Sequence, residues 1–247
     1  MKKNEYQINK EMRVINFQNG VKLVKPDDTQ HAHAPTVASL LQLQFSVYFL
    51  DEHGRTALIN EEGATVCGFD SPTESVGKSL LDVSQQESAS SLIDNCRDVM
   101  QAAATKIFEE ENLRQDGKTM QFLSVKIPWY GDNEQIIGVM GVSIVLGKHS
   151  LSDALSQLKK LGLLNQDKPD QQPLQANQFK INNVQLTQRE MQCLQYTVKG
   201  FTAKEIAQQL GISFRTVEEY LTNIRIKAGA NSKSELIKMT IENFYLE

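Results

Sequence analysis

The chain has 247 residues, of which 40% are apolar and 23% are charged, and its formal net charge is −4. This length fits one or two globular domains, and the composition excludes fibrous and disordered proteins. The charged first residues are followed by no apolar signal-peptide segment, and no stretch approaches the roughly 18 apolar residues of a membrane span. We therefore expect a cytoplasmic protein that does not bind membranes.

The reactive residue types are scattered along the chain. The three cysteines, Cys67, Cys96 and Cys193, form no Cys-x-x-Cys pair, and the four histidines show no metal-ligand spacing with them. We find no phosphate-binding glycine loop, no pairing of a nucleophile with a base, and no aspartate cluster like that of a phosphoacceptor receiver domain. The sequence therefore predicts neither a metal site nor an enzyme.

The amino-terminal half begins with a polar segment. Residues 1–36 contain Pro and His-rich turns, so we expect an extension without a strong element of its own. The β-rich runs Phe45–Leu50 and Arg55–Ile59 flank a turn and predict a hairpin. Asn60 then caps a helical segment that runs towards Gly68.

Helices and a second β block follow. Residues Thr73–Val83 and Ser88–Ala104 read as helical, and Lys106–Leu113, Thr119–Pro128 and Gln135–Leu146 read as strands separated by turns. Two strands, several helices and three more strands predict an α+β domain. Its antiparallel sheet should be covered by helices on one face.

Several motifs in this region resemble those of PAS sensor domains. They are Phe49-Leu-Asp-Glu-His-Gly54, Cys67-Gly-Phe-Asp-Ser-Pro-Thr-Glu74, Val76-Gly-Lys-Ser79 and the closely spaced run Lys126–Ser143, which is similar to the family's last hairpin. The resemblance covers about residues 40–147. It implies a sensor domain, which we place at residues 37–147.

The cofactor of such a domain is not identified by the sequence. Asn95-Cys96-Arg97 is similar to the cysteine motif of light-sensing, flavin-binding relatives, but it lies about one element beyond Val76-Gly-Lys78, which argues against flavin. The helix expected over Ser88–Ala104 has no histidine, which argues against haem. Two alternatives stay open: a small apolar ligand between sheet and helices, and a cavity filled by the protein's own side chains.

Residues 148–185 connect the two halves. Leucines at 151, 155, 158 and 161 follow helical spacing and predict an amphipathic helix over Ser150–Leu164, which either pairs with its twin or lies on its own domain. The Gln-, Asn- and Pro-rich residues 165–178 have little to bury and predict a flexible linker. We therefore place a second domain at residues 186–247.

This second domain contains a helix-turn-helix pattern. Ile206, Ala207, Leu210 and Val217 surround Gly211 at the spacing of two short helices packed across a turn, where glycine accepts a positive φ without steric cost. Capping boxes predict three helix starts, and Ser213 gives half of the signal for a fourth. The boxes are Thr187-x-x-Glu190, Thr202-x-x-Glu205 and Ser232-x-x-Glu235.

The same region resembles the LuxR-type (GerE-type) DNA-binding domain. The segments that fall in that family's order and spacing are Leu186–Leu194, Gly200–Ala207, Leu210–Ser213, Arg215–Glu218 and Ser232–Ile237. The resemblance implies an all-α, four-helix domain that binds double-stranded DNA. It also implies that the helix Phe214–Ala228 enters the major groove.

Helical periodicity indicates which residues of this helix face outward. With Val217 turned inward, Leu221, Ile224 and Ala228 share its side. We expect base contacts from Glu218, Glu219 and Thr222. Phosphate contacts are expected from Thr202, Lys204, Arg215, Thr216, Asn223, Arg225 and Lys227. The family commonly pairs through its last helix, which assigns dimer contacts to Leu236, Ile237, Ile241 and Phe244.

The charge of this domain is low for a DNA-binding protein. Residues 186–247 carry eight Lys and Arg against seven Asp and Glu. Since phosphate neutralisation supplies much of the affinity for DNA, we expect a homodimer, which doubles the contacts. The sequence thus predicts a transcriptional regulator controlled by a PAS-like domain. The alternative is a protein-interaction signalling adaptor whose helical module binds DNA weakly.

Overall fold

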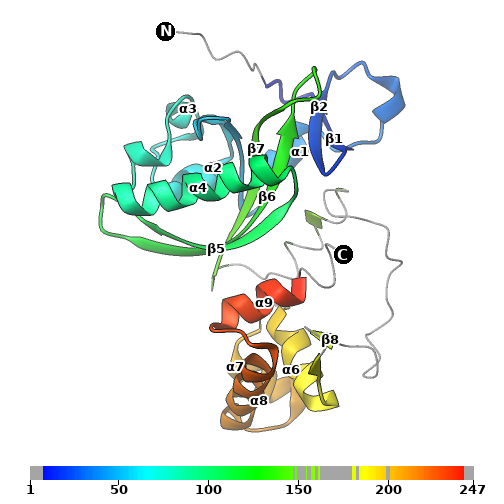
Figure 1. Cartoon of the computed structure of the whole chain (residues 1–247), viewed down its shortest axis with the longest axis vertical. Coiled ribbons are helices and arrows are strands. Elements are labelled where there is room, and N and C mark those ends of the chain that lie inside the picture. Colours follow the sequence, from blue (N-terminus) through cyan, green and yellow to red (C-terminus); the bar gives the residue numbers. More distant parts are fainter. Residues whose placement is uncertain are drawn as a thin grey trace. The chain divides into compact units, whose positions relative to one another are not determined.

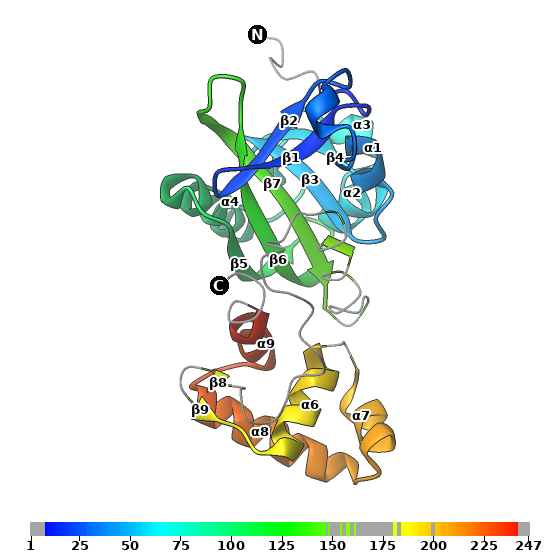
Figure 2. The same cartoon turned by 90° about the vertical axis from the view of Figure 1, so that its right-hand side faces the viewer.

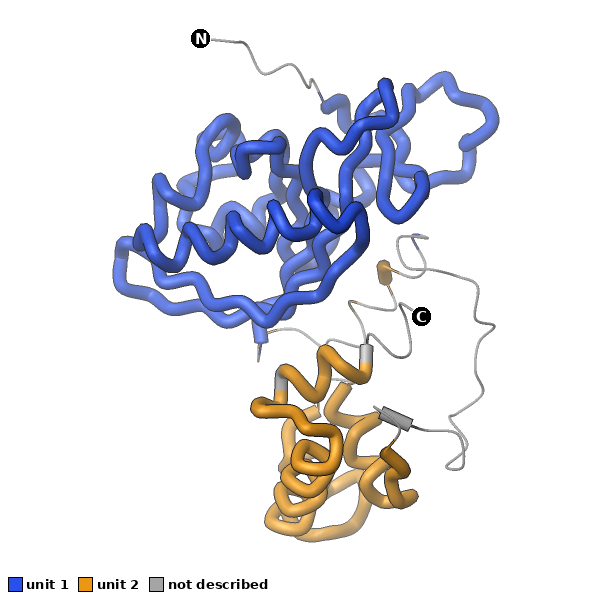
Figure 3. The backbone as a smooth tube through the Cα atoms, viewed as in Figure 1, with its two compact units in different colours: residues 1–146, 161–163 blue, residues 147–160, 164–247 orange. Residues whose placement is uncertain are grey.

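The computed structural model describes residues 8–146, 148, 154, 157, 158, 161, 180, 181, 184–198 and 201–241. The backbone forms two compact units, residues 1–146 with 161–163 and residues 147–160 with 164–247 (Figure 3). We call residues 8–146 the sheet domain and residues 184–241 the helical domain. The expected connector helix, residues 150–164, and the expected linker, residues 165–178, fall almost entirely outside the described residues.

The sheet domain is built on one seven-stranded sheet, which Figures 1 and 2 show from two sides. The strands follow the order β1-β2-β6-β7-β3-β4, and β5 pairs with β6. The expected hairpin β3–β4 and the three later strands β5 to β7 are confirmed. Their bounds are β1 Arg13–Phe17, β2 Gly20–Val24, β3 Ser46–Asp51, β4 Thr56–Ile59, β5 Lys106–Leu113, β6 Thr119–Tyr130 and β7 Ile136–Val145.

The expectation that residues 1–36 lack an element of their own is wrong. Strands β1 and β2 form an antiparallel hairpin, and β2 pairs in parallel with the end of β6, where Val21 lies opposite Trp129. Val21 is fully buried, and Gly20 permits the approach because a Cβ there would overlap the carbonyl oxygen of Pro128. The sheet is therefore mixed rather than purely antiparallel.

Helices cover one face of the sheet, as expected (Figures 1 and 2). Asn60 caps α2 by accepting a hydrogen bond from the backbone nitrogen of Gly63 at 2.9 Å, and Gly68 ends that helix with φ of 100°. The helical elements of this domain are α1 Val37–Leu41, α2 Glu61–Cys67, α3 Pro72–Ser75, α4 Gln86–Ala102 and the 3-10 turns η1 Thr29–His31 and η2 Leu80–Asp82.

The helix expected over Thr73–Val83 is interrupted. Helix α3 ends at Ser75, and the backbone of the next residues bonds to β4 instead of continuing the helix. The nitrogen of Gly77, at φ of 80°, donates to the oxygen of Thr56 at 2.8 Å, and the nitrogen of Thr56 donates to the oxygen of Lys78 at 2.7 Å. A tertiary pairing therefore overrides the local helical pattern.

The helical domain contains four helices, as the resemblance implies. Two buried clusters hold them together, one around Leu194 and Ile224 and one around Ile206 and Val217, and Leu221 packs against both. A two-residue ribbon that the sequence did not predict precedes the first helix. The elements are β9 Val184–Gln185, α6 Gln188–Val198, α7 Ala203–Leu210, α8 Phe214–Ala228 and α9 Lys233–Ile241, and β8 Lys180–Ile181, the partner of β9, lies just before the domain.

Candidate functional site

Local hydrogen bonds fix the turn between α7 and α8. The backbone nitrogen of Thr202 donates to the carboxylate of Glu205 at 2.7 Å, and the nitrogen of Glu205 donates to the hydroxyl of Thr202 at 3.3 Å. The bonds that the carboxylate accepts from the backbone nitrogen and the hydroxyl of Thr202 hold the pKa of Glu205 below its usual range. Gly211 ends α7 in the left-handed conformation, with φ of 64°, and Ser213 caps α8 through the nitrogen of Thr216 at 3.0 Å. The predicted helix-turn-helix is confirmed.

Helix α8 has one buried and one exposed face. Val217 and Ile224 are fully buried, and Ala228 is 4% exposed. The opposite face meets solvent over most of its length, which confirms the orientation expected from periodicity. The exposed residues of α8 are Phe214, Arg215, Glu218, Glu219, Thr222, Asn223, Ile226 and Lys227.

The exposed face of α8 contains both candidate base contacts and candidate phosphate contacts. Arg215 lies one turn before Glu219, and its Nε is 3.4 Å from Oε1 of that carboxylate. Their side chains are 90% and 63% exposed, so this ion pair contributes little and can rearrange on binding. Glu218 and Thr222 flank this pair on the same surface. The structure thus brings the three candidate base-reading residues together.

The other candidate phosphate contacts lie on α7, on α8 and at the start of α7. Lys204 is exposed in the first turn of α7, and Arg225 is half-buried in the last turn of α8. The hydroxyl of Thr202 already bonds to Glu205, and that of Thr216 lies 2.8 Å from the hydroxyl of Ser213. The hydroxyl of Thr202 therefore belongs to the cap of α7, and that of Thr216 lies against Ser213, the cap of α8.

Lys227 differs from the other candidates because its ammonium group is paired inside the domain. Its Nζ lies 2.7 and 2.8 Å from the two carboxylate oxygens of Glu190 on α6. The Glu190 side chain is 5% exposed and that of Lys227 is 40% exposed. This ion pair fastens α8 to α6, which favours a structural role for Lys227 over a phosphate contact.

Two of the residues expected to form the dimer contact, Leu236 and Ile237, are buried. Leu236 is 1% exposed and belongs to the same buried cluster as Leu194 and Ile224, so the domain's own core occupies it. Ile237 is 5% exposed. The side chain of Ile241 and all of Phe244 lie outside the described residues. The assignment of Leu236 to a dimer surface is therefore replaced by a core role.

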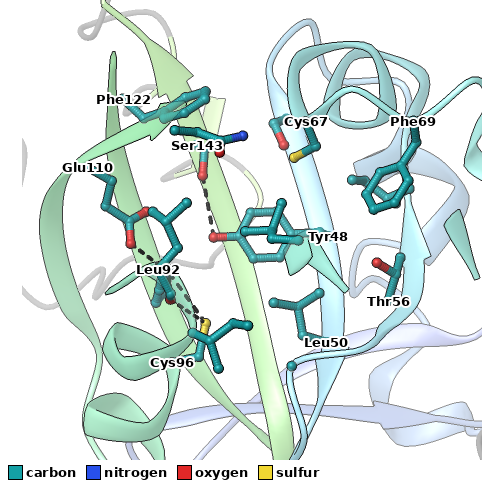
Figure 4. Close-up of a pocket in the computed structure, with 17 residues that line it drawn as sticks. Tyr48, Leu50, Thr56, Cys67, Phe69, Leu92, Cys96, Glu110, Phe122 and Ser143 are labelled. Atoms are coloured by element: carbon teal, nitrogen blue, oxygen red, sulfur yellow. Dashed lines mark hydrogen bonds and ion pairs between the residues drawn. The ribbon is translucent and has the colours of Figure 1, made fainter. Parts of the chain in front are cut away.

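The sheet domain contains a cavity between its sheet and helices (Figure 4). The ring of Tyr48 projects into it from β3, with Ser143 and Glu110 on one side and Cys67 and Phe69 on the other. Its walls thus combine apolar and polar side chains. The further lining residues are Ser46, Leu50, Gly54, Thr56, Ile59, Leu80, Leu92, Ile93, Cys96, Asn112, Phe122 and Lys126.

The floor of this cavity carries a buried ion pair. Nζ of Lys126 lies 2.7 Å from Oε1 of Glu110, and both side chains are 3% exposed. The same ammonium donates to the carbonyl oxygen of Leu92 at 3.1 Å and to Sγ of Cys96 at 3.3 Å. Burial lowers the pKa of Lys126, but the adjacent carboxylate of Glu110 raises it, and the net shift is upward. Lys126 is therefore charged at neutral pH.

The sequence reasoning missed this ion pair, although one signal was present. Lys126 is the only charged residue within the apolar strand segment Phe122–Tyr130. A lysine in such a run must either face solvent or meet a partner in the interior. Its partner Glu110 stands among other acidic residues on β5, where nothing local distinguishes it.

The cavity also contains hydroxyl and thiol groups. The hydroxyl of Ser143 lies 3.3 Å from that of Tyr48, and burial raises the pKa of Tyr48. Burial likewise raises the pKa of the Cys96 thiol and raises that of Cys67 to about 12. Both thiols are therefore protonated at neutral pH, which disfavours nucleophilic chemistry. Across the residues that the structure describes, no group of three His, Cys, Asp or Glu could hold a metal.

Two family models match the chain. Residues 184–240 match the model described as bacterial regulatory proteins of the luxR family, and residues 40–148 match the model described as PAS fold. The helical domain contains the first segment, and the sheet domain contains the second up to residue 146. Among the helices that the structure describes, none is long and apolar enough to cross a membrane.

Curated relatives share only part of their length with this chain. A probable transcriptional regulator, ycf29 of Cyanophora paradoxa, is 39% identical over 70 residues, which are 28% of this chain and 32% of that protein. The transcriptional regulatory protein YdfI of Bacillus subtilis is 43% identical over 61 residues, 25% of this chain and 29% of that protein. The matches thus span about a third of each relative.

A solved structure overlaps more of the chain at lower similarity. The VqmA–ligand–DNA complex of Vibrio cholerae is 21% identical, with coverage of 84% of this chain and 85% of that one, and the TM-score is 0.42. This score is too low to support a conclusion about arrangement or function.

Proposed function

We propose that this chain, which carries a LuxR-type helix-turn-helix domain at residues 184–240 and a PAS-fold domain at residues 40–148, is a DNA-binding transcriptional regulator. One observation carries the proposal. Helix α8 is anchored by Val217 and Ile224 and presents an exposed, mostly polar face along its other side, which also carries Ile226. A helix of this kind, presented after a tight turn, is the element that enters the major groove.

One set of side chains is proposed to contact bases, and a second set is proposed to contact phosphates. Glu219 and its neighbours Glu218 and Thr222 are positioned to meet base edges, where a carboxylate accepts from cytosine N4 and a threonine contacts a thymine methyl. Lys204, Arg215, Asn223 and Arg225 surround them and are suited to phosphate oxygens. Thr202 and Thr216 can contact the DNA backbone only if their hydroxyls leave Glu205 and Ser213, respectively. Lys227 is not included among the phosphate contacts, because its ammonium group is paired with the carboxylate of Glu190.

The protein is proposed to act as a homodimer in the cytoplasm, without a catalytic step. The helical domain carries a small positive excess, and two acidic side chains lie on its DNA-facing surface. A single domain therefore gains little from phosphate neutralisation, whereas two domains on two half-sites double the contacts. The dimer contact cannot rest on Leu236, which the core of the domain occupies.

The PAS-fold domain is proposed to control this binding through a small ligand. Its cavity lies among residues from β3, β5, β6 and α4, so a bound molecule would contact several elements at once. A ligand can shift a binding equilibrium only if it interacts differently with two states of the protein. A ligand in a cavity lined by several elements can favour one arrangement of those elements over another.

An electrophoretic shift experiment tests the regulator proposal. Full-length protein at concentrations that favour the dimer is mixed with genomic fragments at low salt, and sedimentation measures its oligomeric state in parallel. We expect retardation of a subset of fragments and its loss as salt is raised. Absence of retardation by a demonstrated dimer at low salt would refute the proposal.

The weak charge of the helical domain favours one rival function. A signalling adaptor would use the same fold to bind another protein, and the Arg215–Glu219 pair on α8 would then remain as it is. The adaptor proposal predicts no difference between DNA sequences at any salt concentration. Retardation that survives an excess of nonspecific competitor DNA separates the two.

A further inference from the structure

One large apolar side chain stands on the exposed face of α8. Ile226 is 70% exposed, the highest value among the large apolar residues that the structure describes as exposed. Its neighbours one turn earlier on this face, Thr222 and Asn223, are polar and exposed. Isolated apolar residues are common on protein surfaces, so the position of Ile226 on the helix decides what it can contact.

Ile226 lies in line with a side chain that is proposed to read a base. An α-helix turns by about 100° per residue, so Ile226, seven residues after Glu219, differs from it by only about 20° around the helix axis. Thr222 lies between them on the same side, three residues after Glu219. Helices that run along the major groove read bases with side chains three, four and seven residues apart. Ile226 therefore belongs to the same stripe as the base-reading candidates.

The chemistry of the base edges limits what an isoleucine can read. In the major groove, base pairs present hydrogen-bond donors and acceptors, and the apolar group that sets one base apart is the C5-methyl of thymine. An isoleucine side chain can neither donate nor accept a hydrogen bond, so this methyl group is the feature that it fits. A protein partner fits less well, because protein interfaces bury patches of many residues. The exposed side chains within one turn of Ile226 on α8 are polar, namely Thr222, Asn223 and Lys227.

We propose that Ile226 reads a thymine in each half-site through the methyl group of that base. The proposal rests on the proposed DNA-binding function and adds a specificity-determining residue to it. A helix rises by about 1.5 Å per residue, so Ile226 lies about 10 Å beyond Glu219 along the axis. Since successive base pairs are about 3.4 Å apart, this thymine should lie about three base pairs from the pair that Glu219 reads. The thymine expected for Thr222 should lie about one base pair from it.

Replacement of thymine by deoxyuridine tests the contact, because it removes the methyl group and leaves the hydrogen-bonding edge unchanged. The probe is the DNA site that the unaltered full-length protein selects from random sequences, and each thymine of the site is replaced in turn. Fluorescence anisotropy measures the affinity. We expect the replacement at the Ile226 position to weaken binding by about fourfold for each half-site that carries it, since burial of one methyl group corresponds to about that factor.

The variant Ile226→Ala identifies which thymine this side chain contacts. Its affinity for the unmodified site should fall by a similar factor, and deoxyuridine at the Ile226 position should then cause no further loss. Deoxyuridine at the Thr222 position should weaken the variant as much as it weakens the unaltered protein. Leu81→Ala is the matched control, because Leu81 is an exposed apolar residue of the sheet domain. This control should bind every probe as the unaltered protein does.

Two results would overturn the proposal. One is a selected site in which every deoxyuridine weakens Ile226→Ala as much as the unaltered protein, since Ile226 then senses no methyl group. The other is an Ile226→Ala protein that binds the unmodified site as tightly as the unaltered protein. In both cases the unaltered protein still selects a DNA sequence, so the regulator proposal stands. A demonstrated dimer that selects no sequence would refute the regulator proposal and the role of Ile226 together.

Discussion

Each domain contains a Lys–Glu pair with a closest nitrogen–oxygen distance of 2.7 Å, yet the two pairs have different surroundings. In the sheet domain both Lys126 and Glu110 are 3% exposed, whereas in the helical domain Glu190 is 5% and Lys227 40% exposed. A fully buried charge must keep its partner, because water cannot replace it. A half-exposed lysine can turn to solvent instead. The Lys126–Glu110 pair should therefore not separate inside the sheet domain. The Lys227–Glu190 pair, which joins α8 to α6, can open towards solvent.

The largest effect should follow from breaking the buried pair on one side. Lys126→Met leaves Glu110 in the interior without a counter-charge, and we expect the sheet domain to lose about 3–5 kcal/mol of its free energy of unfolding. Urea denaturation measures the loss. The double variant Lys126→Met with Glu110→Leu, which removes both charges, should recover most of it. A single variant that costs less than about 1 kcal/mol would contradict the assigned burial.

A smaller effect is expected from the fastening in the helical domain. Glu190→Gln removes the partner of Lys227, which can then reach solvent, and weakens the cap at Thr187. We expect a loss of about 1–2 kcal/mol in the free energy of unfolding of this domain. Glu219→Gln, which alters the exposed pair with Arg215, is the control and should change it by less than about 0.5 kcal/mol. Equal losses in both would show that burial does not distinguish the pairs.

The same carboxylate gives a prediction for pH. Burial raises the pKa of Glu190, but hydrogen bonds from Lys227 and Thr187 outweigh it, so the folded pKa lies below the ordinary 4.5. Its contribution to stability is therefore complete above pH 4.5 and is lost as pH falls through the folded pKa. Thermal unfolding in an acid series should show this decline, with a shallower slope for Glu190→Gln. An unchanged slope would refute the lowered pKa.

A still smaller effect is expected on the salt dependence of DNA binding. It should distinguish a lysine that contacts DNA from a lysine that stabilises the fold. Lys204→Ala should weaken binding to all sequences and reduce the salt slope of the binding constant by about one. Lys227→Ala should leave that slope unchanged, because Glu190 holds its ammonium group. Fluorescence anisotropy across a salt series measures both, with Lys118→Ala on an exposed turn of the sheet domain as the control. Equal slopes for Lys204→Ala and Lys227→Ala would contradict this division.

The structural features that the sequence predicts best are those determined by residues close together in the chain. The start of α7 at Thr202, its end at Gly211 and the cap at Ser213 all depend on residues within four positions, and each is confirmed. The strand Lys106–Leu113 was also placed correctly, since turn residues delimit it. The sequence does not predict the hairpin β1–β2, although its two short apolar runs flank a turn. The polar residues around these runs are typical of a segment without regular structure.

Contacts between distant residues could not be read in this way. Glu190 and Lys227 are 37 positions apart, and no local pattern tells a paired lysine from one that faces solvent. Leu236 follows the periodicity of both a core residue and an interface residue, and only packing decides between them. Asn112 shows the limit most clearly, because its polar side chain on a strand gives no sign of being buried in a cavity.

Selection of binding sites from random DNA, with unaltered protein and with Glu219→Gln, tests the central claim that the exposed face of α8 reads bases. The unaltered protein should enrich a motif with two related half-sites, and the variant should enrich one that differs at one position in each half-site, since Gln and Glu prefer different bases. Identical motifs would show that Glu219 does not read DNA. Failure of both proteins to enrich any motif would contradict the account as a whole.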